Sequence, residues 1–154
     1  DCLIGDCEFL CANAAGQATN VIVTTATADR LIVEDSILYA ATNDAGLASA
    51  ILLVGGDGHI IRRNKISVYG TTSLGCIETN TTACTNLLIE GNLLDNRTAS
   101  SAKVVAMASN STGWITNNRI GLLTGTAPFT AANAYGVGGN YYSNAAGVAA
   151  GVLI

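Results

Sequence analysis

The chain has 154 residues and a net charge of −4 at pH 7, with 12% charged and 49% hydrophobic side chains. This length is typical of one domain with its own core, and the scarcity of charge together with abundant Val, Ile and Leu excludes intrinsic disorder. The acidic balance argues against a nucleic-acid-binding surface, and no apolar run reaches the roughly 18–20 residues of a membrane helix. We therefore expect residues 1–154 to form a single domain with no nucleic-acid partner and no membrane span.

One short pattern recurs six times along the chain, which indicates a repeat architecture. The copies occupy residues 3–9, 32–38, 60–66, 88–94, 114–120 and 136–142. The fifth residue of each copy, called the anchor below, is small or polar. The anchors are spaced 29, 28, 28, 26 and 22 residues apart. They are Cys7, Ser36, Asn64, Asn92, Asn118 and Asn140.

Two positions around the anchor are occupied by large apolar residues. The residue three before it is always aliphatic: Ile4, Val33, Ile61, Ile89, Ile115 and Val137. The residue two after it is Phe9, Leu38, Ile66, Leu94, Ile120 or, in the last copy, Tyr142. Small or polar residues lie between these positions, so each copy predicts two strands joined by a tight corner where the anchor can bond to the backbone.

A further apolar strand precedes most copies, at residues 21–23, 51–54, 76–77 and 103–107. All these segments are short and rich in β-branched residues, which favours strands over helices. Without crossover helices, each strand has to pair with its own copy one coil along, which predicts an all-β parallel β-solenoid of about five to six coils. Variable loops are expected at residues 40–50, 69–75, 96–102 and 122–134.

The recurring unit, in which Ile precedes the anchor Asn by three positions, resembles that of right-handed parallel β-helix proteins of the pectate-lyase type. The anchors Asn64, Asn92, Asn118 and Asn140 resemble the asparagine ladder at one corner of such proteins. The low charge and the many Ala, Thr, Ser and Gly residues are similar to those of tailed-phage virion and tailspike β-helices. The resemblance implies a right-handed parallel β-helix, and it implies no single function, because lyases, glycosidases, adhesins and tailspikes share this fold.

The position four before the anchor predicts an apolar column on the outside of the solenoid. It adjoins the strict inward position, so strand alternation turns it away from the core. Soluble monomers rarely expose such a column. Unless this register is misread, we expect either a neighbouring subunit or a covering loop to bury the column. The favoured alternative is a subunit interface in a homo-oligomer around a threefold axis. The column contains Leu3, Ile32, Ile60, Leu88 and Trp114.

The position two before the anchor supplies the only weak catalytic candidates, Glu34 and Glu90. They lie two coils apart, roughly 9–10 Å, which is near the upper limit for the paired acids of an inverting glycosidase. Arg62 stands between them in the column and disfavours the protonated form that a general acid requires. A surface ion-pair ladder is the simpler interpretation.

No metal or cofactor site is predicted. Asp6 and Asp35 share the position one before the anchor with Arg63, but calcium requires 6–8 oxygen ligands. The only histidine, His59, follows a turn and is expected to be solvated rather than to act as a base.

Cysteines and sequons add little to these expectations. The five cysteines, at positions 2, 7, 11, 76 and 84, are expected to be buried free thiols, although a Cys2–Cys11 or a Cys76–Cys84 bridge stays open. Glycosylation at the three Asn-X-Ser/Thr sites would require secretion through a glycosylating host. These sites are Asn80, Asn96 and Asn110, all expected in turns.

The leading functional hypothesis is a non-enzymatic structural component of a virion or extracellular assembly, either a homo-oligomer or bound to other virion proteins. One alternative is a polysaccharide-binding or polysaccharide-degrading β-helix, with a sugar groove at Tyr39 or Tyr69 on the variable loops. Another is a surface adhesin or a filament subunit. Neither end shows a polar cap, so we expect the functional unit to continue in a longer chain or a partner.

Overall fold

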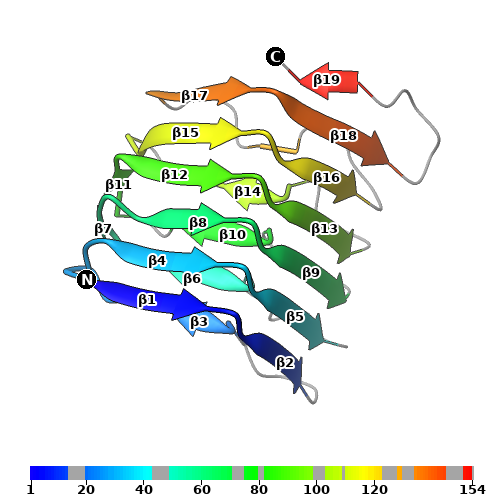
Figure 1. The fold of residues 1–154 in the computed structure, drawn as a ribbon, viewed down its shortest axis with the longest axis horizontal. Coiled ribbons are helices and arrows are strands. Elements are labelled where there is room, and N and C mark those ends of the chain that lie inside the picture. The colour runs from blue at the N-terminus through cyan, green and yellow to red at the C-terminus, as the bar shows by residue number, and fades with distance from the viewer. Residues whose placement is uncertain are drawn as a thin grey trace.

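The computed structural model describes residues 1–13, 20–42, 49–70, 75–79, 82–98, 103–108, 110–122, 128–129, 134–144 and 151–153. Within these ranges the chain forms strands and turns and contains no helix, and therefore none that could cross a membrane. The strands wind into a parallel β-solenoid, with β1 (Cys2–Gly5) at one end of the stack and β17 (Ala134–Gly138) and β18 (Asn140–Asn144) at the other (Figure 1). The predicted fold class is confirmed.

The first sheet contains the strand that precedes each anchor. Its six strands pair in parallel and in chain order, and equivalent positions of the repeat are direct partners, as for Leu3 with Ile32 and Leu88 with Trp114. The pairing therefore has the register that the repeat predicts. The strands are β1 (Cys2–Gly5), β4 (Leu31–Glu34), β8 (Ile60–Arg62), β12 (Leu87–Glu90), β15 (Thr112–Thr116) and β17 (Ala134–Gly138).

The second sheet contains the strand that follows each corner. Three of its strands run beyond the expected loop starts at Ala40, Tyr69 and Asn96, because parallel pairing with the neighbouring coils continues through these residues. The parallel strands are β2 (Glu8–Asn13), β5 (Ile37–Thr42), β9 (Lys65–Gly70), β13 (Leu93–Thr98), β16 (Arg119–Leu122) and β18 (Asn140–Asn144).

Strand β19 (Gly151–Leu153) pairs antiparallel with β18, so that Val152 is the partner of Tyr141. The sequence predicts an open strand edge at residues 152–154, and Val152 and Leu153 do form the edge strand of the second sheet. Their backbone covers part of the β18 edge.

The third sheet contains β3 (Ile22–Val23), β6 (Ile51–Leu53), β10 (Ile77–Thr79) and β14 (Val105–Ala106). A two-stranded sheet, formed by β7 (Gly56–Asp57) and β11 (Cys84–Thr85), lies at the turn that leads back to the first sheet. Since the third sheet has only four described strands, fewer coils are paired on all three sides than the five to six expected.

The inward columns of the three sheets form one continuous core. Val33, Ile61 and Ile89 in the first sheet are completely buried, as are Leu38 and Ile66 in the second. Ile4 and Phe9 in the first coil are only partly buried because each has a stacking neighbour on one side alone. Tyr142 in the last coil is partly buried because one of its two neighbours, Gly151, has no side chain. Burial of each Ile or Leu stabilises the fold by about 1.5–3 kcal/mol.

The anchors form a hydrogen-bonded ladder at the corner between the first and second sheets. The amide N–H of Asn64 donates to Oδ1 of Asn92 at 2.9 Å, and the N–H of Asn92 donates to Oδ1 of Asn118 at 2.9 Å. Nδ2 of Asn92 also donates to the carbonyl of Ile61, one coil back, at 2.9 Å. The four asparagines are at most 2% exposed, so the ladder satisfies buried polar groups that would otherwise destabilise the corner.

The first two anchors continue the ladder with other chemistry. The amide N–H of Ser36 donates to Oδ1 of Asn64 at 3.0 Å, and the Ser36 hydroxyl accepts the N–H of Cys7 at 3.1 Å. Cys7 joins the ladder through its backbone, and its side chain is exposed. Anchors of three residue types, Cys, Ser and Asn, therefore take equivalent positions at the corner, with the backbone N–H donating to the side chain of the next anchor.

Candidate functional site

The apolar column on the outside of the first sheet is the candidate site, and its five residues are called the outer stripe below. Pairing places Leu3, Ile32, Ile60, Leu88 and Trp114 side by side in this order. Leu3 is 63% exposed and Trp114 is 61% exposed, so no described segment covers either end. The three central members are half-buried, each flanked by stripe residues on both sides.

Trp114 is the broadest side chain of the outer stripe. Its indole lies over Gly136, the next residue of the column, and a Cβ atom at position 136 would overlap the ring. The ring also borders a hollow of about 440 Å³ that is lined by Leu88, Gly113 and Gly136 among others. An exposed Trp beside a hollow is typical of residues that dominate protein–protein interfaces.

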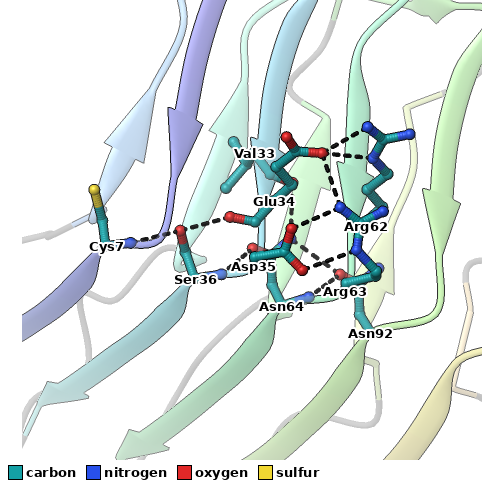
Figure 2. Close-up of polar contacts among 9 residues, drawn as sticks. All are labelled: Cys7, Val33, Glu34, Asp35, Ser36, Arg62, Arg63, Asn64 and Asn92. Carbon is teal, nitrogen blue, oxygen red and sulfur yellow. Dashed lines mark hydrogen bonds and ion pairs between the residues drawn. The ribbon is translucent and has the colours of Figure 1, made fainter.

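An ion-pair network borders the outer stripe at the corner (Figure 2). Arg62 Nη2 lies 2.6 Å from Glu34 Oε2, and Arg63 Nη2 lies 3.1 Å from the same oxygen. Arg63 also forms two bonds with the Asp35 carboxylate, at 2.6 and 2.8 Å. The hydrogen bonds from Arg63 hold the pKa of Asp35 below its ordinary value. The four side chains link two successive coils and stabilise their register.

The two weak catalytic candidates are not brought together as an acid pair. Glu34 is engaged by Arg62 and Arg63, whereas Glu90 is half-buried and makes no ion pair with any described residue. Pairing sets Arg62 between the two carboxylates in the column. This arrangement suits a structural ion pair at Glu34 and leaves Glu90 outside the ion-pair network.

The position one before the anchor has a backbone role that the sequence interpretation missed. Asp6, Asp35, Arg63 and Asn117 have φ angles of 49–56°, and Gly91 and Gly139 have φ angles of 64–65°. This left-handed conformation favours Gly, Asn and Asp. The acids of this column are therefore explained by corner geometry, and in the part of the chain that the structure describes no cluster of acids, His and Cys could hold a metal ion.

His59 is completely buried, so the expectation of a solvated histidine is wrong. Its Nδ1 accepts the N–H of Leu31 at 3.1 Å, and its Nε2 lies 2.9 Å from the carbonyl oxygen of Gly55. These bonds fit the tautomer with the proton on Nε2. Both ring nitrogens are engaged in holding the backbone of adjacent coils, which leaves none for proton transfer.

Glu78 is the one described acid whose pKa is raised, because burial disfavours its charged form. Its Oε2 accepts a hydrogen bond from the Ser49 hydroxyl at 3.2 Å. Its neighbours in the column are Leu52 and Ala106, so no second acid or base stacks directly beside it. Glu78 could therefore act as an acid, but no base stacks directly beside it to complete an acid–base pair.

The sequons differ in accessibility. Asn110 is exposed in a turn, and Asn80 lies outside the described residues. Asn96 lies within β13, completely buried, and its Nδ2 donates to the carbonyl of Lys103. The turn expected at Asn96 is therefore wrong, and a glycan on this side chain is incompatible with the fold.

All five cysteines are free thiols, so neither possible bridge is formed. Cys76 and Cys84 are buried as expected, and burial raises the pKa of the Cys84 thiol to about 11. Cys2 and Cys7 are exposed, contrary to the expectation of burial. Cys7 lies at the corner, whereas Cys2 occupies the inward column of Leu31 but lies on β1, the edge strand of the first sheet.

The outer face of the second sheet carries two tyrosines that the sequence interpretation assigned to variable loops. Tyr39 and Tyr69 lie on strands β5 and β9 rather than on loops, and their ring centroids are 5.1 Å apart. Further along this face a hollow of about 270 Å³ lies above Gly121, with Tyr141 and Arg119 in its wall. Spacing from the anchor could have indicated this face, since outward positions fall one, three and five residues after it.

The comparisons with known proteins identify no relative: no family model and no curated protein matches the sequence, and no solved structure matches the fold.

Proposed function

We propose that this protein is a non-enzymatic structural component of a virion or extracellular assembly, of the phage tail, spike or head-surface type, which self-associates through the outer stripe. The observation that carries the proposal is the pairing register, which aligns five large apolar residues on the outside of one sheet. Exposed apolar patches of this kind mark interaction surfaces. The engagement of Glu34 in ion pairs agrees with a structural role.

Sedimentation velocity of the purified chain tests this proposal. We expect wild type to sediment as an oligomer, with a trimer favoured, and the variant with Ile60→Asp and Leu88→Asp to sediment as a monomer, because a buried carboxylate without a partner destabilises an interface. Val23→Asp, at a 55% exposed position of the third sheet, is the matched control and should stay oligomeric. A monomeric wild type, or an oligomeric double variant with unchanged circular dichroism, contradicts the proposal.

A polysaccharide-binding β-helix is the second candidate, and the Tyr39–Tyr69 pair favours it because sugar rings pack on aromatic faces. Titration with a panel of acidic polysaccharides tests it. Binding that is lost in Tyr69→Ala supports this candidate, and cleavage that is lost in Glu34→Gln or Glu90→Gln would add enzymatic activity. Open-ended filaments in electron micrographs would instead support an adhesin or filament subunit.

A further inference from the structure

We propose that the outer stripe of one copy packs on the second sheet of a neighbouring copy at the same height along the solenoid, with Trp114 seated in the hollow above Gly121. This inference rests on the self-association proposed above and names the surface that receives the stripe. The partner is a second copy of this chain, so the two faces of one molecule have to be complementary to each other.

The receiving surface is the column three residues after each anchor, called the receiving column below. Pairing aligns its members side by side across five coils. Leu10, at its start, is 72% exposed, and Gly121, in the fifth coil, has no side chain and is paired with Ser143 of the last coil. The members of the column in the first five coils are Leu10, Tyr39, Ser67, Asp95 and Gly121.

The side chains of the outer stripe and the receiving column are complementary in size when two copies dock with parallel solenoid axes and without a shift along these axes. Each stripe residue then faces the receiving residue of the same coil. Leu3 faces Leu10, and these two are the most exposed residues of their columns. Trp114 faces Gly121, so the largest side chain of the stripe lies opposite the smallest residue of the receiving column. The carboxylate of Asp95 is already neutralised, because Arg97 Nε lies 2.7 and 3.0 Å from its two oxygens.

The hollow above Gly121 suits a side chain better than a substrate. Its volume of about 270 Å³ falls below the roughly 300–1,000 Å³ of small-molecule sites. Arg97, Arg119 and Tyr141 surround it, and guanidinium groups interact favourably with an indole face. Trp, Tyr and Arg are also the residues that contribute most to protein–protein interfaces.

In the same arrangement Arg62, which is already paired with Glu34, would face Lys65 in the third coil, and opposite charges meet in the fourth coil. Glu90, beside the stripe in the fourth coil, would face Leu93, which lies between Lys65 and Arg119 in its column. Neighbouring strands are about 4.8 Å apart, so Glu90 would reach both cations. None of the three forms an ion pair with a described residue within its own copy.

Docking without a shift along the axis relates the copies by a rotation alone. A heterologous contact without a shift closes into a ring when its rotation is a whole fraction of a full turn, whereas one with a shift produces a filament. The geometry therefore points to a closed ring of parallel solenoids.

The test is Gly121→Leu, which fills the hollow. Gly121 does not have a positive φ, and the first atom that a Cβ would meet is Oδ1 of Asp95, at 2.6 Å, on a side chain that can rotate away. We expect association to weaken roughly thirtyfold or more, the effect of losing a dominant interface residue. Mixing Gly121→Leu with the Ile60→Asp and Leu88→Asp variant should give a one-to-one dimer, because one chain keeps the stripe and the other keeps the receiving column.

Three outcomes overturn the inference in different ways. If Gly121→Leu associates like wild type while the stripe variant is monomeric, the stripe binds another surface and only the further inference is wrong. The same conclusion follows if the mixed variants do not dimerise. If wild type is monomeric, the proposed function and the further inference both fail.

Discussion

The indole of Trp114 occupies the space beside Gly136, one coil further along the same outward column, that a side chain at position 136 would fill. The ring can adopt this position only because residue 136 has no side chain. Its orientation therefore depends on a glycine in a neighbouring strand, and this dependence can be tested without altering Trp114 itself.

Gly136→Ala should displace the indole, since the new methyl group would overlap the ring. Trp114 is the only tryptophan of the chain, so its fluorescence emission reports the change directly. We expect a shifted emission maximum with unchanged far-ultraviolet circular dichroism. Gly138→Ala is the control, because its Cβ would meet no atom within 4 Å, and it should leave the spectrum unaltered. An unchanged spectrum in Gly136→Ala would show that the ring lies elsewhere in solution.

Asn92→Ala should destabilise the fold strongly. The substitution removes the acceptor for the N–H of Asn64 and the donor to the carbonyl of Ile61, both of which are buried. Unsatisfied buried groups cost about 1–3 kcal/mol each, so we expect a loss on the order of 3–5 kcal/mol in the free energy of unfolding, measured by urea denaturation. Ser36→Ala, where water can reach Cys7, should lose about 1 kcal/mol. Equal losses at both positions would argue against the ladder as the stabilising element.

Gly91→Ala should lower the free energy of unfolding by about 1–2 kcal/mol through the backbone alone. Gly91 has a φ of 64°, and a Cβ there would meet only Cγ of Arg63, at an ordinary 3.9 Å. Gly91→Asn should cost less, because Asn tolerates the left-handed region better. Thermal unfolding monitored by circular dichroism gives the order, and an Asn variant less stable than the Ala variant would refute the backbone explanation.

Glu78→Gln should change how stability depends on pH. Burial raises the pKa of Glu78, so the folded chain binds this proton more tightly than the unfolded chain does. Its contribution to stability is therefore present below the ordinary carboxyl pKa of about 4.3 and is lost as pH rises through the raised value. We expect Glu78→Gln to be more stable than wild type at pH 7 and similar near pH 3.5 in urea unfolding. Glu8→Gln, at an exposed position, should show no such divergence.

The repeat predicted those parts of the fold that depend on residues at fixed distances from the anchor. The inward columns, the pairing register and the outer stripe all follow from strand alternation within one coil. The left-handed corner could also have been recognised, since Asp6, Asp35, Gly91, Asn117 and Gly139 are all types that tolerate positive φ.

The features that the sequence did not predict depend on contacts between coils, and no pattern within a single repeat unit encodes these contacts. His59 is buried because it binds backbone atoms of Leu31 and Gly55, and backbone atoms leave no signature in the sequence. The hollow above Gly121 similarly requires the position of Asp95 on the adjacent strand. The extra length of β5, β9 and β13 reflects continued pairing among coils rather than any property of each strand.

The asparagine ladder bonds its members at the same spacing whatever the length of chain between them. Anchors 28, 28, 26 and 22 residues apart are joined by hydrogen bonds of 3.0, 2.9, 2.9 and 2.9 Å. The spacing between anchors at the corner is therefore one coil in every case and does not depend on the number of residues in that coil. Such a scaffold can accept insertions and deletions in one coil while the neighbouring coils keep their positions. The loops can therefore vary in length independently of one another, both in evolution and in protein engineering.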